Sequence, residues 1–165
     1  MQLKVKRLTD TAVLPVKAHP TDAGFDICAD EERNIYSGQT VCVSTGIAIA
    51  IPEGYYGRLK GRSGLTSKTA LRVQEGTIDS DYRGEIKVIC DTRDTMLSDD
   101  VWSDDCYFEI TKGMKLAQLI IQPLPTVEVV DVDELDDTDR GDGGFGSTGV
   151  YCRIDAGKYH EEEEQ

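Results

Sequence analysis

Short runs of apolar and β-branched residues, separated by glycine and proline, recur along the chain and constrain its fold more than any other feature. The clearest runs cover residues 2–8, 41–51 and 115–122. In the first of them apolar and polar residues alternate, which is the period of a β-strand and not that of a helix. Sixteen glycines supply the turns that short strands need. We therefore predict an all-β fold.

One segment departs from this pattern and predicts a single short helix. Residues 62–70 contain few β-branched side chains, and Ser63 stands where a serine can cap a helix start. The 165 residues suffice for one domain with its own core. We predict this β domain over 1–130, with an acidic inserted loop at 91–106. A flexible arm at 131–150 and an acidic tail at 151–165 follow.

Composition argues against several classes of function. The net charge of −13 opposes binding to nucleic acid, which needs a basic face. No run of about 18 apolar residues occurs and the N-terminus lacks the apolar core of a signal peptide, so we expect no membrane span and a cytoplasmic protein. The five cysteines form no Cys-x-x-Cys pair, which disfavours a disulfide framework or a zinc site. Only two histidines are present, both near an end, which disfavours Ser-His-Asp catalysis.

The segment from Gly76 to Gly84 (GTIDSDYRG) is the first candidate site. Apolar, extended segments run into it and out of it, which predicts a β-hairpin whose turn carries functional side chains. Period-two geometry sends Ile78 and Asp79 to opposite faces, so the apolar residue can fix a carboxylate at the mouth of a pocket. A plain polar turn is the alternative interpretation.

Five basic residues lie close together in the middle of the sequence, which predicts an anion-binding site there. They are Lys60, Arg62, Lys68, Arg72 and Arg83. Arg62-Ser63-Gly64 at a helix start adds free N–H groups to a guanidinium, although an ordinary helix cap has the same residues. Gln118 is a polar residue in an apolar strand. It is either a ligand contact or an outward-facing strand position.

Residues 140–149 (RGDGGFGSTG) form a glycine-rich segment that matches several motifs without their context. A dinucleotide loop must open a long helix, and only about 15 residues remain after it. A P-loop needs lysine where Ser147 stands, and an adhesion signal needs a secreted chain. A flexible tail is the plain alternative. Phe145, however, can stack on a planar base while Arg140 and its neighbours hold phosphate.

Taken together and in order, five segments resemble the motifs of the trimeric deoxyuridine triphosphatases (dUTPases). They are residues 23–26 (AGFD), 62–65 (RSGL), 76–84, 113–119 (GMKLAQL) and 140–149. The resemblance implies a distorted jelly-roll β-barrel assembled as a homotrimer with active sites shared between subunits. It implies hydrolysis of dUTP to dUMP and pyrophosphate with Mg²⁺, which keeps dUTP low and supplies dUMP for thymidylate synthesis.

The resemblance also implies roles for residues near the base and the reacting water. Asp79 activates the water that attacks the α-phosphorus, and Tyr82 packs under the deoxyribose. The backbone of residues 73–78, including Gly76 and Ile78, reads uracil. We expect burial against Ile78 and beside Tyr82 to make Asp79 a better base than an exposed carboxylate.

The remaining roles concern the triphosphate. Asp26 is implied to hold magnesium through bound waters, because metal and arginine must cancel charge before attack. Phosphate contacts are implied for Arg62, Ser63, Gly64 and Gln118. A mobile arm is implied to close over the nucleotide, with Phe145 on the base and Arg140 on the γ-phosphate; its residues are Arg140, Phe145, Gly146, Ser147 and Thr148.

Three features depart from the family pattern. The connection at 91–106 is roughly ten residues longer than compact members need. Val73-Gln74-Glu75 is bulkier than the small residues often found there, and a tail follows the fifth motif. Long insertions occur in phage-type members, which suggests a viral source and the host cytoplasm.

Two other functions remain open at this point. The first is a regulatory protein partner bound through 91–106 or the tail, since an exposed Trp102 among acids would be an anchor. A Trp102 packed against the sheet is the alternative interpretation. The second is dCTP deamination within the same fold, which would release ammonia rather than pyrophosphate.

Overall fold

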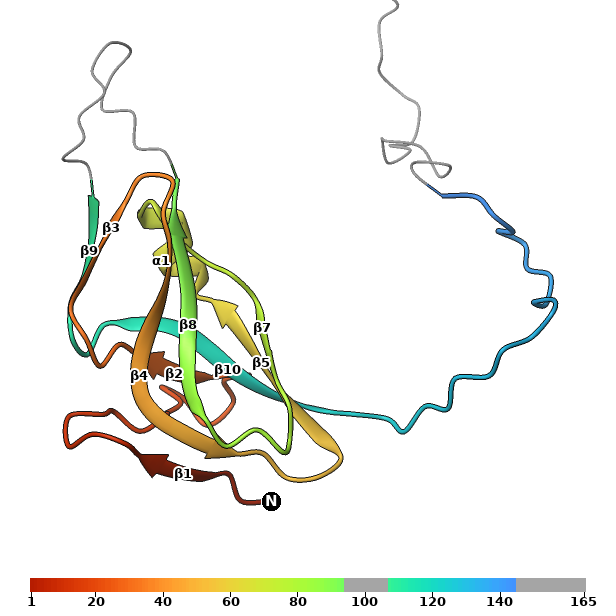
Figure 1. Cartoon of the computed structure of the whole chain (residues 1–165), viewed down its shortest axis with the longest axis horizontal. Coiled ribbons are helices and arrows are strands. Elements are labelled where there is room, and N and C mark those ends of the chain that lie inside the picture. Colours follow the sequence, from red (N-terminus) through yellow and green to blue (C-terminus); the bar gives the residue numbers. More distant parts are fainter. Residues whose placement is uncertain (94–106, 145–165) are drawn as a thin grey trace, which may run out of the picture. The chain divides into compact units, whose positions relative to one another are not determined.

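The structure, a computed structural model, describes residues 1–93 and 107–144 (Figure 1). It contains ten strands and one short helix in these ranges: β1 (Lys4–Arg7), β2 (Phe25–Cys28), β3 (Arg33–Tyr36), β4 (Thr40–Ala50), β5 (Tyr55–Gly61), α1 (Ser63–Lys68), β6 (Leu71–Val73), β7 (Gly76–Ile78), β8 (Glu85–Thr92), β9 (Tyr107–Ile110) and β10 (Lys115–Pro123). The predicted all-β fold with one short helix is confirmed.

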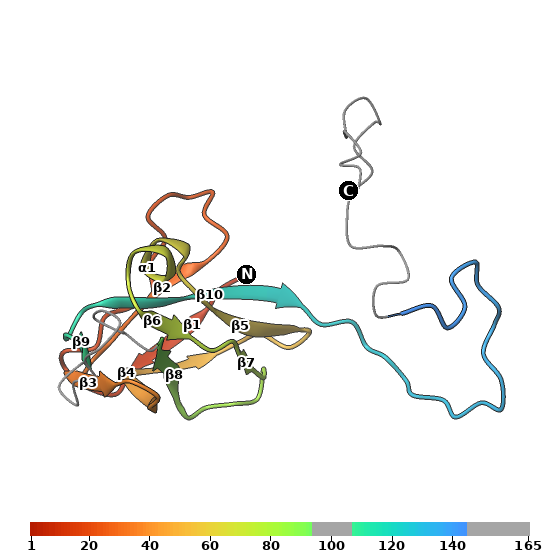
Figure 2. The same cartoon turned by 90° about the horizontal axis from the view of Figure 1, so that it is seen from above.

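The strands form two four-stranded sheets, ordered β1-β4-β8-β6 and β2-β10-β5-β7, and a small sheet of β3 and β9. All these pairings are antiparallel. Figure 2 shows β10 running along its sheet with β2 and β5 beside it. The sheets stay separate and do not close into a barrel in the described residues. The jelly-roll prediction is confirmed in this two-sheet form.

The core lies between the two larger sheets. In β8, Ile86, Val88 and Cys90 are buried, and the residues that alternate with them are more exposed. Leu59 of β5 and Leu119 of β10 join the same apolar cluster from the other sheet. Burial raises the pKa of the Cys90 thiol to about 12, so this cysteine is an inert core side chain.

Two local predictions are wrong in detail. The residue that caps α1 is Arg62 and no side chain caps the helix, because Ser63 already lies in the first turn. Asp91 and Thr92, which were predicted to belong to the inserted loop, are the last residues of β8 and pair with β6. Strand β3 was not predicted from the sequence, because it has a single buried residue, Ile35, and therefore little apolar pattern.

The two arms of the predicted hairpin do pair, but the connection between them contains a further strand, β7, and this difference shapes the site. Strand β6 does pair with β8, but β7 leaves that sheet and pairs with β5 at the edge of the other. Ile78 lies opposite Gly57, where an added Cβ would come within 3.3 Å of the Ile78 Cβ and 2.7 Å of the Ile51 Cδ1. Glycine at 57 thus allows β7 to pack closely against β5.

The chain divides into two compact units, 1–127 and 128–165. The described part of the second unit, 128–144, contains no strand or helix. Its apolar side chains lie in solvent; Val129 is 93% exposed and Leu135 is 86% exposed. None of the helices in the described ranges has the length and apolar character to span a membrane.

A buried carboxylate ties three segments of the first unit together. Asp30 is 9% exposed and accepts hydrogen bonds from the hydroxyls of Thr9 and, at 2.7 Å, Thr11. Lys112 Nζ lies 3.4 Å from its Oδ1. The Thr9 hydroxyl, supported by Thr11 and Lys112, holds the pKa of Asp30 below its usual value despite burial.

Asp30→Asn should lower the free energy of unfolding near neutral pH by about 1–3 kcal/mol, because it removes the charge that these donors satisfy. The pKa of Asp30 is lower in the folded protein than in the unfolded chain, where it is about 3.9. The stabilisation by the ionised Asp30 carboxylate is therefore complete above the unfolded pKa and is lost as the pH falls through the folded pKa. Urea unfolding across this pH range measures it. Asp10→Asn, at an exposed carboxylate on the same turn as Thr9 and Thr11, is the control. The prediction would be contradicted if the Asp30→Asn variant stayed less stable than the wild type by the same free energy of unfolding in acid.

Candidate active site

A buried carboxylate on β2 collects three of the predicted site residues. Asp26 is 4% exposed. Its Oδ1 lies 3.3 Å from Arg62 Nε and accepts a hydrogen bond of 3.5 Å from Gln118 Nε2. Its Oδ2 lies 2.8 Å from Lys115 Nζ. Elements far apart in the sequence therefore meet at Asp26, which we call the Asp26 cluster (Asp26, Arg62, Lys115 and Gln118).

Lys115 was missed because a regular strand would place residues 115 and 118 on opposite faces. A register shift between Lys115 and Ala117 sets Lys115 opposite Cys28 and Gln118 opposite Asp26. Cys28 and Asp26 share a face of β2, so the bulge brings both β10 side chains to the same side. No pattern in the sequence marks this bulge.

The Asp26 cluster carries two cations and one carboxylate, so its net charge favours an anion. Both carboxylate oxygens of Asp26 already have cationic partners. Within the described ranges, no group of three or more His, Cys, Asp or Glu side chains could hold a metal ion. These residues do not fit a directly bound resident magnesium ion. They fit the phosphates of a ligand.

The start of α1 lies next to this cluster because Arg62 belongs to both. Arg62 has extended backbone, and Ser63 and Gly64 follow it as exposed residues. The first N–H groups of a helix have no acceptor within the helix. Arg62 also donates a 3.4 Å hydrogen bond to the Lys115 carbonyl, which fixes its guanidinium beside β10. Guanidinium, ammonium and amide N–H groups are thus presented together.

A separate cavity of about 650 Å³ contains the other predicted residues. Gly76, Ile78, Asp79 and Tyr82 all line it. Ile78 is 6% exposed at the end of β7, whereas Asp79, the first residue after the strand, is exposed. The Tyr82 hydroxyl donates a 3.1 Å hydrogen bond to the Glu85 carbonyl. A Cβ at Gly84 would overlap the Tyr82 ring, so glycine is needed for this ring position.

The expected burial of Asp79 is not found within one chain. Asp79 is exposed, and Tyr82 is 46% exposed. The reason is the edge position of β7, which ends at Ile78 and releases Asp79 into the connection beyond the sheet. Any desolvation of this carboxylate must come from a ligand, the arm or another chain.

The two groups of residues lie at opposite ends of β5. Ile78 pairs with Gly57, which puts Asp79 level with Tyr56, whereas Arg62 follows Gly61 at the other end. At about 3.3 Å per residue, the separation along the strand is about 20 Å. A single chain therefore does not bring Asp79 and the Asp26 cluster to the same phosphate.

The fifth predicted segment is described only at its beginning. Arg140 Nε donates a 2.7 Å hydrogen bond to the Gly143 carbonyl within a turn of the second unit. The predicted arm residues Phe145, Gly146, Ser147 and Thr148 lie outside the described residues. The same holds for Trp102 and for residues 94–106 of the predicted partner-binding loop.

Comparison with known proteins gives a consistent result. A model of the dUTPase family matches residues 10–149. A deoxyuridine 5'-triphosphate nucleotidohydrolase of Hydrogenobaculum sp. (strain Y04AAS1) is 45% identical over 153 residues, covering 91% of this chain and 99% of the relative. That of Arabidopsis thaliana is 42% identical over 147 residues, covering 89% and 82%.

Two solved phage structures are also similar. The Staphylococcus bacteriophage 80alpha dUTPase with dUpNHpp has a TM-score of 0.82 and 34% identity, covering 90% of this chain and 99% of that chain. A mutant dUTPase of the S. aureus phage phi11, described with a structural Mg(II) ion, has a TM-score of 0.74 and 32% identity, covering 81% and 98%.

Lys115→Met should lower the free energy of unfolding by about 1 kcal/mol, because the buried Asp26 loses its shortest ion pair. The loss is no larger because solvent screens the partly exposed Lys115 ammonium group. The Lys115 side chain is 43% exposed. Urea unfolding at one protein concentration measures the change. Lys4→Met on β1 serves as the control, and equal losses in both variants would show that the Asp26 pairing contributes nothing.

Proposed function

Because the chain belongs to the dUTPase family and is a dUTP diphosphatase, we propose that Asp79 is the base that activates the attacking water. The observation that carries this proposal is the grouping of Gly76, Ile78, Asp79 and Tyr82 around one cavity. A carboxylate at the rim, an apolar wall and an aromatic ring suit a nucleoside whose α-phosphate lies at the cavity mouth.

In the proposed reaction, the Asp79 carboxylate accepts a proton from a water molecule. The water oxygen forms a bond to the α-phosphorus, and the bond from that phosphorus to the oxygen bridging to the β-phosphate breaks. The products are dUMP and pyrophosphate. General-base assistance of this kind contributes about 10²–10⁴-fold to a rate.

The triphosphate is proposed to bind the Asp26 cluster and the first turn of α1. Arg62, Ser63, Gly64 and Gln118 contact phosphate oxygens, and we add Lys115 to this set. Their charge offsets the repulsion between the phosphates and an incoming hydroxide-like nucleophile. We propose that magnesium arrives as the salt of the nucleotide and meets Asp26 only through waters, because Asp26 already has two cationic partners.

Uracil is proposed to be read by the main chain of β7. Among the described strands, β7 is the last of its sheet and pairs only with β5, so the backbone groups on its outer side can bind a base. Such groups have fixed positions and can exclude a methyl substituent on the ring. The Tyr82 ring, held by Gly84 and the Glu85 carbonyl, disfavours a 2′-hydroxyl on the sugar.

We propose a homotrimer in which one chain supplies Asp79 and a second supplies the Asp26 cluster. The separation of the two groups along β5 supports this arrangement, since neither group alone could bind and cleave a triphosphate. Arg140 and the arm residues 145–148 would come from a chain of the same trimer. The supply of dUMP, the cytoplasmic location and a partner bound through 91–106 remain predictions.

Asp79→Asn should reduce pyrophosphate release from dUTP by at least about a hundredfold, because an amide cannot accept the proton. Asp81→Asn, at an exposed carboxylate two residues along, should retain the wild-type rate. Pyrophosphate and ammonia should be measured with dUTP, dCTP, dTTP and UTP, so that deamination is detected if it occurs. Undiminished turnover by the Asp79 variant, with its fold intact, would remove this residue as the base.

Shared sites can be tested by mixing two inactive variants, Asp79→Asn and Arg62→Ala. After joint unfolding and refolding, random assembly gives about a quarter of sites an intact Asp79 from one chain and an intact Arg62 from another. The mixture should therefore recover about a quarter of wild-type activity. Each variant refolded alone is the control. Absence of recovery, with mixed assemblies demonstrated by mass, would mean that each site belongs to one chain.

A further inference from the structure

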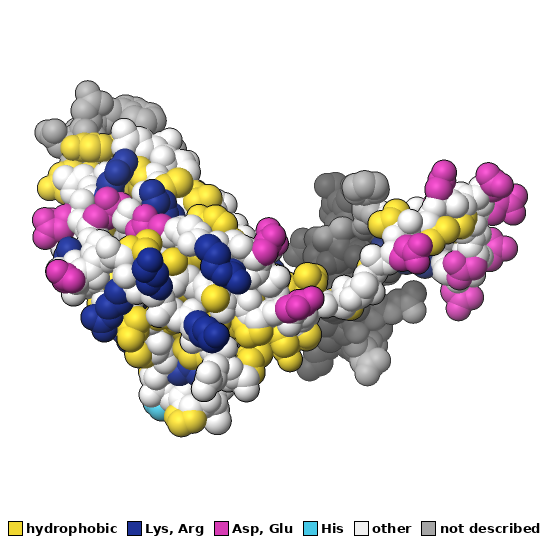
Figure 3. Space-filling model, turned by 60° about the horizontal axis from the view of Figure 1, so that its bottom comes forward, with side chains coloured by type: hydrophobic (Ala, Val, Ile, Leu, Met, Phe, Trp, Pro, Cys, Tyr) yellow, Lys and Arg dark blue, Asp and Glu magenta, His cyan; other side chains and the backbone are white. Residues whose placement is uncertain are grey.

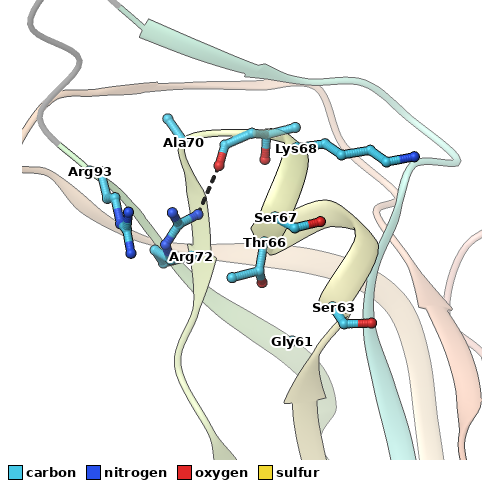
Figure 4. Close-up of a pocket in the computed structure, with 9 residues that line it drawn as sticks. Gly61, Ser63, Thr66, Ser67, Lys68, Ala70, Arg72 and Arg93 are labelled. Atoms are coloured by element: carbon cyan, nitrogen blue, oxygen red, sulfur yellow. Dashed lines mark hydrogen bonds between the residues drawn. The ribbon is translucent and has the colours of Figure 1, made fainter. Parts of the chain in front are cut away.

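A second and larger cavity, of about 910 Å³, lies beside α1 and is bounded by β6 and the end of β8 (Figure 4). Its lining includes three cationic side chains, Lys68, Arg72 and Arg93, together with hydroxyl groups such as that of Thr66. None of the described residues that line it is acidic, although the chain has a net charge of −13. The positive charge of this lining favours a negatively charged ligand.

The two arginines are neighbours because of the β6–β8 register. Arg72 lies opposite Asp91, and the Arg93 N–H continues the pairing with a 3.0 Å hydrogen bond to the Ala70 carbonyl. Arg72 and Arg93 are therefore diagonal neighbours on one face of the strand pair. Figure 4 shows their guanidinium groups side by side, whereas Lys68 points away from them. Adjacent like charges repel unless an anion lies between them.

The nearby carboxylate of Asp91 is hydrogen-bonded elsewhere. Asp91 accepts a hydrogen bond from the Gln74 side chain and, within the described chain, forms no ion pair with either arginine. Arg72 Nη1 donates to the carbonyls of Thr69 at 2.8 Å and Leu71 at 2.6 Å, which fixes the plane of its guanidinium. Among the described residues, Arg93 has no side-chain partner. The Arg72 guanidinium is thus held in place, and the Arg93 guanidinium can bind a ligand.

We propose that this cavity binds a phosphate-type oxyanion between Arg72 and Arg93, with Thr66 as a further donor. Guanidinium forks match the oxygens of phosphate, and charge-assisted bonds of this kind are the strong ones. None of the Asp26 cluster residues lines this cavity, whereas Ser63, a proposed contact of the nucleotide phosphates, does. The two sites therefore adjoin at the start of α1, and it is the pair Arg72 and Arg93 that belongs to this cavity alone. Inorganic phosphate and pyrophosphate share the required chemistry.

The test is calorimetric titration of the full chain with pyrophosphate and, separately, with phosphate. The nucleotide site is first saturated with dUpNHpp, the analogue bound to the 80alpha relative. One of the two anions should still bind, at about one per chain. Arg93→Ala should weaken binding at least about tenfold, because one charge-assisted contact is lost. Arg33→Ala, at an exposed arginine on β3, should leave binding unchanged.

Three outcomes would overturn the proposal. The first is equal affinity in the two arginine variants. The second is complete loss of anion binding when dUpNHpp is present, which would assign the anion to the nucleotide site alone. The third is a change in oligomeric mass on Arg93→Ala with no change in anion affinity, which would make the arginine a subunit contact. None depends on Asp79, so failure here is distinguishable from failure of the proposed hydrolysis.

Discussion

The passage of the chain from β6 in one sheet to β7 at the edge of the other is the constraint on which the site depends. It places Ile78 against Gly57 and so positions Asp79 at one end of β5. The Asp26 cluster forms at the opposite end, where β2 and β10 meet the start of α1. Within one chain the two groups of predicted site residues therefore lie apart.

The sequence predicts β8 through its alternation of apolar and polar residues, because burial of one face of a strand imposes that period. It predicts β10 through an apolar run that ends at proline. It predicts Asp26, Arg62 and Gln118 as site residues through the family resemblance, and the structure brings these three together. It misses Lys115, since a bulge changes the face of a side chain without leaving a pattern. It also misses the pairing of β7 with β5 in the other sheet, because strand order across two sheets is decided by long-range packing.

Charge is distributed unevenly along the chain, and the total is a poor guide to what it binds. Residues 1–127 contain 18 acidic and 15 basic side chains, whereas residues 128–165 contain 13 acidic and 3 basic ones. In Figure 3, acidic side chains dominate the described part of the second unit, while Lys and Arg are spread over the face of the first unit in view. Local anion sites are therefore compatible with a strongly acidic protein.

Glu75, one of the bulkier residues before β7, lies 2.6 Å from Arg58 and 3.4 Å from Lys60 on β5. Its carboxylate is paired with these two cations, and Glu75 does not line the cavity of Asp79 and Tyr82. A strand that recognises its ligand through peptide groups leaves its side chains free to drift during evolution. Under the proposed recognition of uracil by the main chain of β7, members of the family can keep one base specificity while the side chains of this segment differ.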